Sequence, residues 1–461
     1  MKLVKSLLLG SAAGIVAVGS AVAADLPVRK AAPVDYVQVC SQFGTGYFFI
    51  PGTDTCLRIG GHVRWTGTFS ENKWTTGVTA ASGFALDPAG GQPTAGGATL
   101  GRGSNAFTMG TNREIGITAL TATEFGTLES MIRLTNESAD RAYVDFAGFR
   151  AGLFPTVFSA GGSAAFTGGT GLRGATAVNQ LTYTADLGAA SVTLGISNPN
   201  ADATGIANAR TPRLPFGATA TGVYGAGATP GPAVPVAGRM PDIVGNVKAS
   251  FGDVDLHLGG ALTQLRTTAQ NNTGFIGSTY GWALQGRADV GLGTISPSTS
   301  LTLVGTYTDG ALWYLNAPDG RGLGRYQLSY ADAYVVNGGL STTTGWSIYG
   351  ALNHGWAPNV SQTVYGVYGE INVPAAARRT FNAGQTPFNL VTDPNNSSFW
   401  QLGSKIEWNP VANLMVGLDV NYTAVQAQNR VLVAGTEGAN NAIYQRNSDA
   451  WAAQLRIQRN F

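Results

Sequence analysis

The feature that most constrains this chain is an alternation of apolar and polar residues with a period of two, which recurs in one segment after another. In the stretch CLRIGGHVRWTGTF at 56–69, Leu57, Ile59 and Val63 fall on one face, and Arg58 and Arg64 fall on the other. A period of two indicates a β-strand, because successive side chains of a strand point to opposite faces. The apolar face of such a strand either packs into a protein core or faces lipid, and this stretch alone leaves both open.

Sixteen segments of the chain share this alternation. By residue number they are 57–69, 108–120, 126–137, 140–147, 149–155, 178–187, 190–197, 242–251, 253–265, 279–290, 298–308, 343–353, 359–371, 397–408, 413–425 and 449–461. The segment 326–336 also resembles a strand and would make the count seventeen. Counts from the two ends of the chain agree only if 309–342 is a single long loop, so we favour the even number.

The connections between these segments fall into two sets. One set is tight, at 147–148, 187–190, 252, 291–293, 354–359 and 409–413, and the other is long and rich in Gly, Pro, Ala and Asn, at 70–107, 156–177, 198–241, 309–342, 372–396 and 426–448. Short turns at one rim and long loops at the other are typical of outer-membrane barrels. The sequence therefore predicts an all-β fold, a 16-stranded antiparallel transmembrane β-barrel with short periplasmic turns and long extracellular loops.

In every segment one face is apolar and the other is polar. The apolar face includes residues such as Leu194, Leu258, Trp282 and Leu418. In a soluble protein these faces would need a covering layer, and no helical pattern long enough to cover a sheet is visible. A closed barrel pairs every backbone group that lies in lipid. Sixteen strands also enclose more space than side chains can fill, which predicts a water-filled lumen.

Aromatic residues gather near the segment ends on the apolar face, as the interfacial girdles of barrels do. They are Trp65, Tyr183, Tyr280, Trp282, Tyr307, Trp346, Tyr365, Trp400, Trp408, Tyr422 and Trp451. Each of them taken singly is compatible with an ordinary core, but the set favours a membrane.

The first 23 residues have the features of a secretory signal peptide, with Lys2 and Lys5 before an uncharged run that ends in small residues. A single transmembrane helix is the alternative, but the run is short and no stop-transfer charges follow it. We expect 1–23 to be the signal peptide, 24–56 a periplasmic N-terminal segment and 57–461 the barrel. Without Lys2 and Lys5 the chain has 26 basic and 26 acidic residues, so its bulk charge predicts no nucleic-acid partner.

The chain contains two cysteines, Cys40 and Cys56. In an exported protein two cysteines this close imply one disulfide that closes a small loop. Two free thiols are the alternative. A metal site is disfavoured, because two cysteines without clustered histidines cannot complete a ligand set.

Several stretches closely resemble the porin family of alphaproteobacterial outer membranes, the group typified by the porins of Brucella and rhizobia. They include YVQVCSQFGTGYFFIPGTDTCLRIGGHVRW at 36–65, WNPVANLMVGLDVNYT at 408–423 and the terminal LRIQRNF. The resemblance implies a homotrimeric passive-diffusion channel in contact with outer-membrane lipid and lipopolysaccharide, with no cofactor. It further implies that the third extracellular loop, 156–176, folds inward. The terminal Phe461 is similar to the aromatic C-terminal residue by which the barrel-assembly machinery recognises barrel proteins.

Selectivity in such a channel depends on lumen width and on charged groups at the constriction. The charged residues that we expect to line the pore are Arg58, Arg64, Glu129, Arg133, Asp145, Arg150, Arg173, Arg287, Lys405 and Arg456, with further inward acids at Asp253, Asp255, Asp289 and Asp419. The loop 156–176 contains no acid and only one of these arginines, Arg173. Clustered arginines attract anions, so we expect a weakly selective or mildly anion-preferring pore. The alternative is that the charges pair along the wall and only solvate it.

Two other function classes are weighed against a channel. A barrel enzyme would need a Ser/His or paired-acid constellation, whereas His62, His257 and His354 are scattered over separate segments, too far apart for a metal set or a hydrolase triad. An energised transporter or an adhesin would have a plugged barrel or use the barrel as a platform, and only residues 24–55, too few for a plug, precede the first strand. The motif GTGLRG at 169–174 matches a dinucleotide fingerprint by letter, but it lacks the surrounding strand and helix.

Overall fold

The computed structural model describes thirteen ranges of the chain: residues 38–70, 106–159, 161, 164–166, 177–198, 233–236, 240–269, 275–294, 296–317, 332–336, 339–375, 396–434 and 443–461. The expected signal peptide at 1–23 and Arg173 lie outside these residues. Within them, no helix has the length and apolar character needed to cross a membrane.

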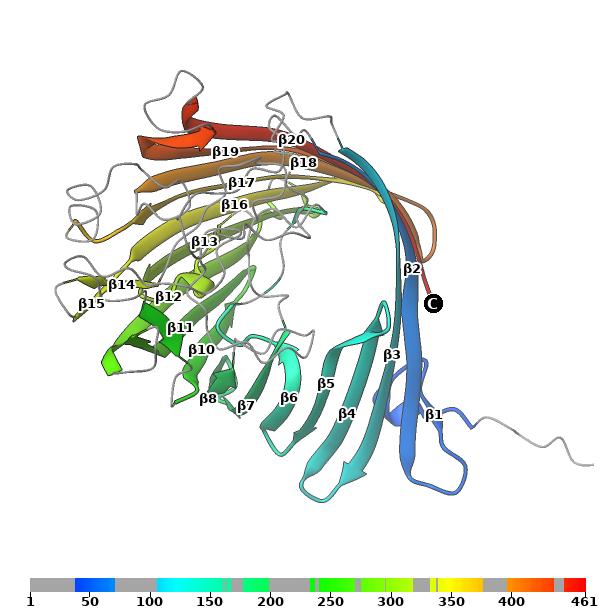
Figure 1. The fold of residues 1–461 in the computed structure, drawn as a ribbon. Helices are drawn as coiled ribbons and strands as arrows, with labels where there is room; N and C mark the ends of the chain where they lie inside the picture. Colours follow the sequence, from blue (N-terminus) through cyan, green and yellow to red (C-terminus); the bar gives the residue numbers. More distant parts are fainter. Residues whose placement is uncertain are drawn as a thin grey trace, which may run out of the picture.

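Sixteen strands form one continuous antiparallel wall (Figure 1). They are β2 (Thr55–Ser70), β3 (Ala106–Thr123), β4 (Gly126–Thr135), β5 (Ser138–Phe146), β6 (Phe149–Pro155), β7 (Ala177–Asp186), β8 (Ala190–Asn198), β10 (Asp242–Phe251), β11 (Val254–Ala269), β12 (Phe275–Gly291), β13 (Thr299–Asp309), β16 (Thr344–Ala357), β17 (Val360–Asn372), β18 (Ser397–Val411), β19 (Leu414–Ala434) and β20 (Ile443–Asn460). Each overlaps one of the sixteen predicted segments, so the predicted fold class is confirmed.

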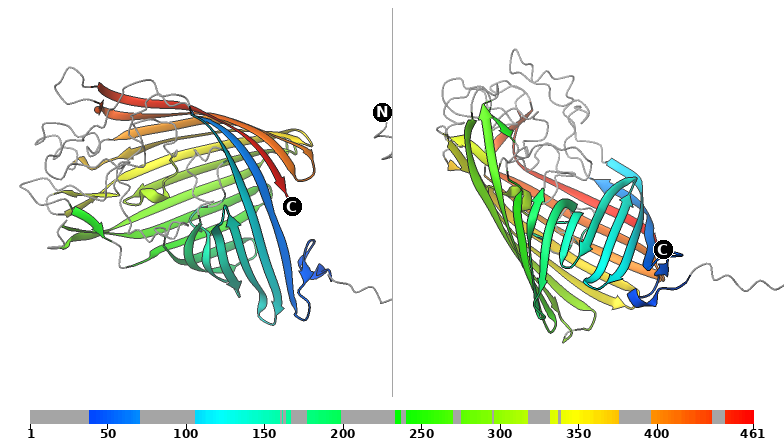
Figure 2. Two further views of the ribbon diagram at one scale, coloured as in Figure 1. Left: turned by 45° about the vertical axis from the view of Figure 1, so that its right-hand side comes forward. Right: turned by 90° about the horizontal axis from the view of Figure 1, so that it is seen from below.

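The wall closes because the first and last of these strands pair with each other. In β2, Arg64 stands opposite Asn112 of β3 on one side and Gln458 of β20 on the other. The terminal residue takes part, since Gly61 and Phe461 exchange two backbone hydrogen bonds of 3.1 Å. Figure 2 shows the first strand of the wall, β2 in blue, beside the last, β20 in red. Closure removes the exposed sheet edge that would otherwise carry unpaired backbone groups.

Four shorter strands lie outside this wall. The two residues of β1 (Phe48–Phe49) pair with the start of β2, and β9 (Ala233–Val236) pairs with the end of β11. The strands β14 (Ala333–Val336) and β15 (Gly339–Thr342) form a separate hairpin. The ambiguous segment 326–336 therefore contains a strand that belongs to a loop and not to the barrel, in agreement with the even count.

The two rims of the barrel differ in their connections. At one rim the chain reverses within a few residues, as at Ala147 and Gly148, which both adopt positive φ values of 51° and 84°. Positive φ at both central residues is what a type I′ hairpin turn requires. The opposite rim carries the long connections, with the exception of the short turn between β4 and β5 at 136–137.

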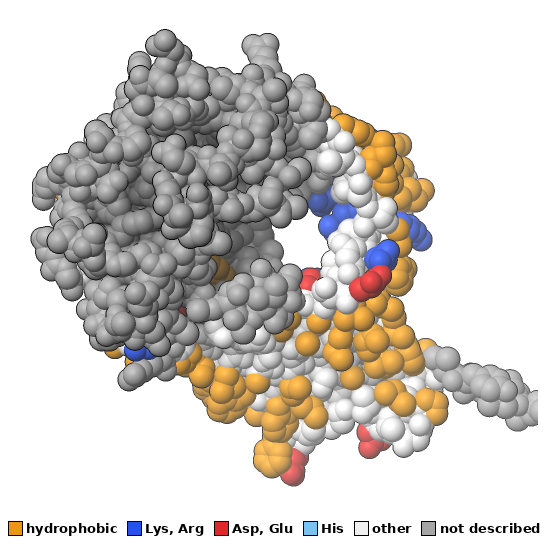
Figure 3. Space-filling model, in the orientation of Figure 1, with side chains coloured by type: hydrophobic (Ala, Val, Ile, Leu, Met, Phe, Trp, Pro, Cys, Tyr) orange, Lys and Arg blue, Asp and Glu red, His pale blue; other side chains and the backbone are white. Residues whose placement is uncertain are grey.

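The outer face of the wall is apolar. Leu194, Leu258 and Leu402 are 62%, 57% and 57% exposed, and hydrophobic side chains gather on the part of the outer surface that Figure 3 shows. The inward neighbours are polar and buried, as are Gln285 and Asp419. The predicted separation of the two faces is confirmed.

One predicted girdle residue, Tyr365, was placed on the wrong face. It points inward and is 1% exposed. The alternation is ambiguous in β17, because Val367 and Ile371 on the same inward face are also buried. Apolar side chains occur on this part of the inner wall because loop residues cover it, as described below.

Candidate functional site

The connection between β6 and β7 enters the barrel as soon as it leaves β6. The carbonyl oxygen of Val157 accepts a hydrogen bond of 2.7 Å from Asn246 Nδ2 on β10, and the carbonyl oxygen of Phe158 lies 3.0 Å from His257 Nε2 on β11. At Gly259, also on β11, a Cβ would stand 1.9 Å from the Phe158 oxygen. A glycine is needed here because the loop backbone lies directly on the wall.

The same loop continues along the interior to the far side of the barrel. The backbone N–H of Ala164 donates to the Tyr349 hydroxyl on β16 at 3.3 Å, and that of Phe166 donates to Asp419 Oδ2 on β19 at 2.7 Å. The Tyr365 hydroxyl donates to the other oxygen of Asp419 at 2.6 Å. Residues 156–159, 161 and 164–166, which we call the constriction loop, therefore cross the inner wall from β6 to β19.

Phe166 holds the far end of the constriction loop. Its carbonyl oxygen accepts a hydrogen bond of 3.1 Å from Arg456, whose guanidinium also lies 3.9 Å from the centre of the Phe166 ring. Lys405 Nζ lies 5.0 Å from the same ring. At Gly417 a Cβ would stand 2.6 Å from the ring, so only glycine leaves room for it. Two of the predicted pore-lining cations thus contact the loop.

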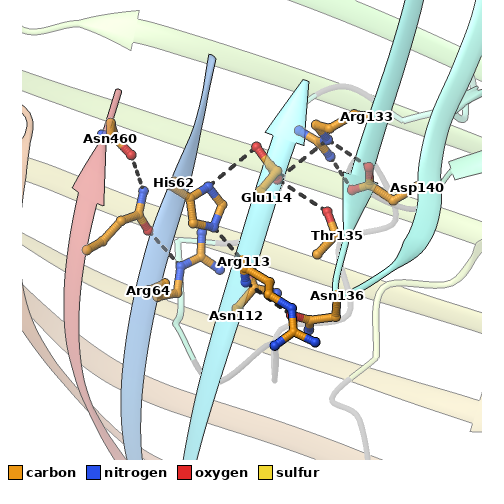
Figure 4. A network of polar contacts seen from close by, with 11 residues as sticks. His62, Arg64, Asn112, Arg113, Glu114, Arg133, Thr135, Asn136, Asp140 and Asn460 are labelled. Carbon is orange, nitrogen blue, oxygen red and sulfur yellow. Dashed lines mark hydrogen bonds and ion pairs between the residues drawn. The ribbon is translucent and has the colours of Figure 1, made fainter. Parts of the chain in front are cut away.

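The wall formed by β2 to β5 carries a network of charged side chains, shown in Figure 4. Arg133 on β4 binds Asp140 through two hydrogen bonds of 2.8 and 2.5 Å, and its Nε lies 3.5 Å from Glu114 Oε2 on β3. Glu114 also lies 3.4 Å from His62 Nδ1 on β2. The charge of Arg133 is therefore balanced by two carboxylates. The sequence did not single out Glu114 or Asp140.

Three more predicted cations have an acidic partner on their own or a neighbouring strand. Arg150 Nη2 lies 2.7 Å from Asp145, Arg287 Nε lies 2.5 Å from Asp289, and Lys405 Nζ lies 2.8 Å from Glu407. Glu129 accepts a hydrogen bond of 3.0 Å from the Tyr143 hydroxyl. Much of the interior charge is thus paired along the wall.

Other cations of the inner wall lack such a partner. Arg64 donates to Gln458 Oε1 at 2.6 Å, and Arg58 lies 4.9 Å from the Tyr47 ring. Among the residues that the structure describes, no carboxylate lies within 4.0 Å of Arg58, Arg64, Arg141 or Arg456. Arg141 is an inward cation on β5 that the sequence analysis missed, although its alternation with Tyr143 and Asp145 placed it on the polar face. Figure 3 shows Lys/Arg and Asp/Glu side chains beside the opening of the barrel.

The N-terminal segment carries the disulfide. Cys40 and Cys56 are bonded, with their Cα atoms 6.0 Å apart, and both are fully buried. Tyr47 packs against them. The described residues include no group of three or more His, Cys, Asp or Glu side chains that could hold a metal ion.

Phe166 is a further residue of the site that the sequence did not single out. It is the only aromatic residue in the Gly- and Ala-rich part, 159–176, of a loop expected to fold inward. A single aromatic in such a context is a signal that a loop is anchored, because ring burial stabilises a segment that has few other side chains to pack.

Comparison with known proteins places the chain among outer-membrane proteins. The family described as the Porin subfamily matches residues 25–453. A putative outer membrane protein of Sinorhizobium fredii is 37% identical over 152 residues, which are 32% of this chain and 42% of that protein. The porin Omp2a of Brucella ovis is 59% identical over 63 residues, 13% of this chain and 18% of the porin. The matched stretches span less than half the length of these relatives.

A solved structure supports the same fold. The outer membrane channel DcaP of Acinetobacter baumannii aligns over 90% of this chain and 99% of its own, with a TM-score of 0.58 and 10% sequence identity.

Proposed function

Since the chain belongs to the porin family, whose members are outer-membrane channels and not enzymes, we propose that it forms a water-filled passive-diffusion channel for small hydrophilic solutes and ions. The observation that carries the proposal is the closed wall of sixteen strands whose polar inner face is crossed by the constriction loop. A wall of this size encloses more volume than side chains fill. The loop then sets the narrowest cross-section.

The charges support a weak selectivity with a mild preference for anions. Four predicted cations, Arg133, Arg150, Arg287 and Lys405, have carboxylates beside them, which reduces their field in the lumen. Arg64 and Arg456 have no such partner among the described residues. Arg64 stands on β2 and Arg456 on the adjacent β20, so two positive charges adjoin in the wall. Their combined potential attracts anions at low ionic strength.

We propose further that three copies associate, with β2, β3 and β20 near the contact. Phe107 and Met109 on the outside of β3 are 59% and 68% exposed. Pairing between β3 and β4 begins only at Glu114, so within the described residues the edge of β3 above that point pairs with β2 alone. An apolar surface beside an unpaired strand edge suits a subunit contact.

Outer-membrane lipid, lipopolysaccharide and the barrel-assembly machinery are the remaining proposed partners. The exposed apolar side chains of the outer wall suit contact with acyl chains. Phe461 is 63% exposed at the end of the closing strand, where an assembly factor could reach it.

Conductance across a planar bilayer tests the channel. We expect large, ohmic steps in groups of three, a small reversal potential of the anion-preferring sign in a salt gradient, and sugar permeation that falls with size. Absence of steps from correctly folded protein would contradict the channel. A strong cation preference would contradict the proposed selectivity alone, and single ungrouped steps would contradict the trimer alone.

A further inference from the structure

Residues 310–317, which follow β13, fold into the barrel and pack against the constriction loop. We propose that this second inward segment narrows the lumen together with the constriction loop, and that Tyr314 is the positioning residue that fixes the two against each other. The inference rests on the proposed channel function and adds a second determinant of its pore size.

The second inward segment lies inside the wall. Its Tyr314 is fully buried, and the hydroxyl donates to Asp242 Oδ2 on β10 at 2.6 Å. Two residues later, Asn316 Nδ2 donates to Thr306 Oγ1 on β13 at 2.9 Å. In the wall β11 and β12 stand between β10 and β13. The segment therefore crosses the inner faces of two strands, and Figure 1 shows its short helix η3 (Leu312–Tyr314) within the ring.

The wall beneath the segment is shaped to receive it. The inward residues there include Val244 on β10, Ala261 on β11 and Ala283 on β12, which form a buried apolar cluster with Tyr314. Apolar residues that faced a water-filled lumen would lose the stabilisation of burial, which is about 25 cal/mol of free energy for each Å² of apolar surface removed from water. Small inward alanines on adjacent strands make sense when a loop covers them.

The start of the segment is held by hydrogen bonds to residues that precede β16. The N–H of Gly310 donates to the Thr343 oxygen at 2.8 Å, and that of Leu312 donates to Asp332 Oδ1 at 2.7 Å. The N–H of Thr343 in turn donates to the Asp332 oxygen at 2.9 Å. These bonds join the start of the β13–β16 connection to its end, so the segment has a fixed place in the interior.

The segment and the constriction loop contact each other through aromatic rings. The ring centres of Phe158 and Tyr314 are 4.6 Å apart, and both side chains are fully buried. Further along, Ala317 and Ala164 pack against the same apolar cluster that contains Tyr349. The constriction loop and the second inward segment therefore lie side by side on the inner wall at Phe158 and Tyr314. Loss of the Tyr314 ring removes one of the surfaces that hold Phe158 in place.

Substitution of Tyr314 tests the inference by single-channel conductance and by permeation of a size series of sugars into liposomes. Tyr314→Phe keeps the ring contact and loses the bond to Asp242, so we expect a small change. Tyr314→Ala loses both, and we expect conductance to rise about 1.5- to 2-fold and larger sugars to enter, because the narrowest cross-section limits a passive pore. The conductance of the double variant Phe158→Ala/Tyr314→Ala should be only slightly higher than that of either single variant, because both substitutions remove the same contact.

Tyr422→Phe is the matched control. The Tyr422 hydroxyl also donates to an aspartate, Asp449, at 2.7 Å, but on the outside of the barrel, so conductance should not change. Heat-modifiable electrophoretic mobility shows whether each variant forms a barrel. If Tyr314→Ala does not, Tyr314→Leu keeps an apolar side chain in the cluster and is measured instead.

Wild-type conductance and sugar exclusion in a folded Tyr314→Ala or Tyr314→Leu barrel would overturn the inference while leaving the channel intact. A wild-type protein that does not conduct would instead overturn the proposed function.

Discussion

At the scale of single residues, carboxylates on the inner wall pair with several of its cations and reduce the electric field of these cations in the lumen. Asp140, through hydrogen bonds, and Glu114, through an ion pair, balance the charge of Arg133, whereas Arg64 donates a hydrogen bond to the amide of Gln458. An amide fixes the position of a guanidinium and leaves its charge in place. Paired charges and cations without a described carboxylate partner therefore both occur on the wall, and the anion preference stays a prediction.

Replacement of Arg64 tests whether an uncompensated cation sets the selectivity. We expect Arg64→Gln to lower the chloride-to-potassium permeability ratio in reversal-potential measurements. The effect should be larger at low salt, because the Debye length falls from about 30 Å at 0.01 M to about 3 Å at 1 M.

Arg113→Gln is the control for that experiment. Arg113 lies on the neighbouring strand β3, but it faces outward and is paired with Glu137. Equal shifts from both substitutions would mean that the field of Arg64 has no special access to the lumen.

At the scale of elements, strands and loops are stabilised by different contacts. Each strand pairs its backbone with two neighbours and presents one apolar face, which leaves a regular signal in the sequence. The constriction loop has no such period. Asn246 of the wall donates a hydrogen bond to it, and its own Ala164 and Phe166 donate to the wall. Gly259 of the wall leaves room for its backbone.

A methyl group at Gly259 should displace the constriction loop. In Gly259→Ala the added Cβ would stand 1.9 Å from the Phe158 carbonyl oxygen, so the loop backbone must move off the wall. We expect a measurable change in single-channel conductance with a barrel that still forms. Gly286→Ala on the adjacent strand is the control, since nothing lies within 4 Å of a Cβ there. A wild-type conductance in folded Gly259→Ala would show that the loop does not limit flow at this point.

At the scale of the whole molecule, closure of the wall creates an outer and an inner environment. Successive side chains of each strand face these two environments in turn. Leu258 and His257 are neighbours in β11, yet the first is 57% exposed on the outside and the second is 5% exposed beneath the constriction loop. The outer surface suits acyl chains, and the inner surface suits water and loop contacts. The same substitution should therefore have different consequences on the two sides.

A pair of arginine substitutions checks this assignment. Leu258→Arg places a charge on the lipid side and should destabilise the barrel by about 2–4 kcal/mol if the residue lies near the bilayer midplane. Met131→Arg places the same charge on the inner face of β4 and should change stability much less while it strengthens the anion preference. Urea unfolding in lipid vesicles measures the first effect, and reversal potentials measure the second. Equal destabilisation by both would contradict the inside-out arrangement of the wall.

The sequence by itself determined the strands, their number and, apart from Tyr365 in β17, which side chains point outward, because a period of two is a local property that every strand repeats. It also indicated most of the charged residues that the structure places on the inner wall, since parity along a strand fixes the side of each residue. Only the tertiary structure decided that Tyr365 faces inward, that Glu114 and Asp140 balance Arg133, and that residues 310–317 enter the barrel beside the constriction loop. These features depend on contacts between strands and loops that are far apart in the chain. A loop without periodicity has no sequence pattern that predicts the surface on which it packs.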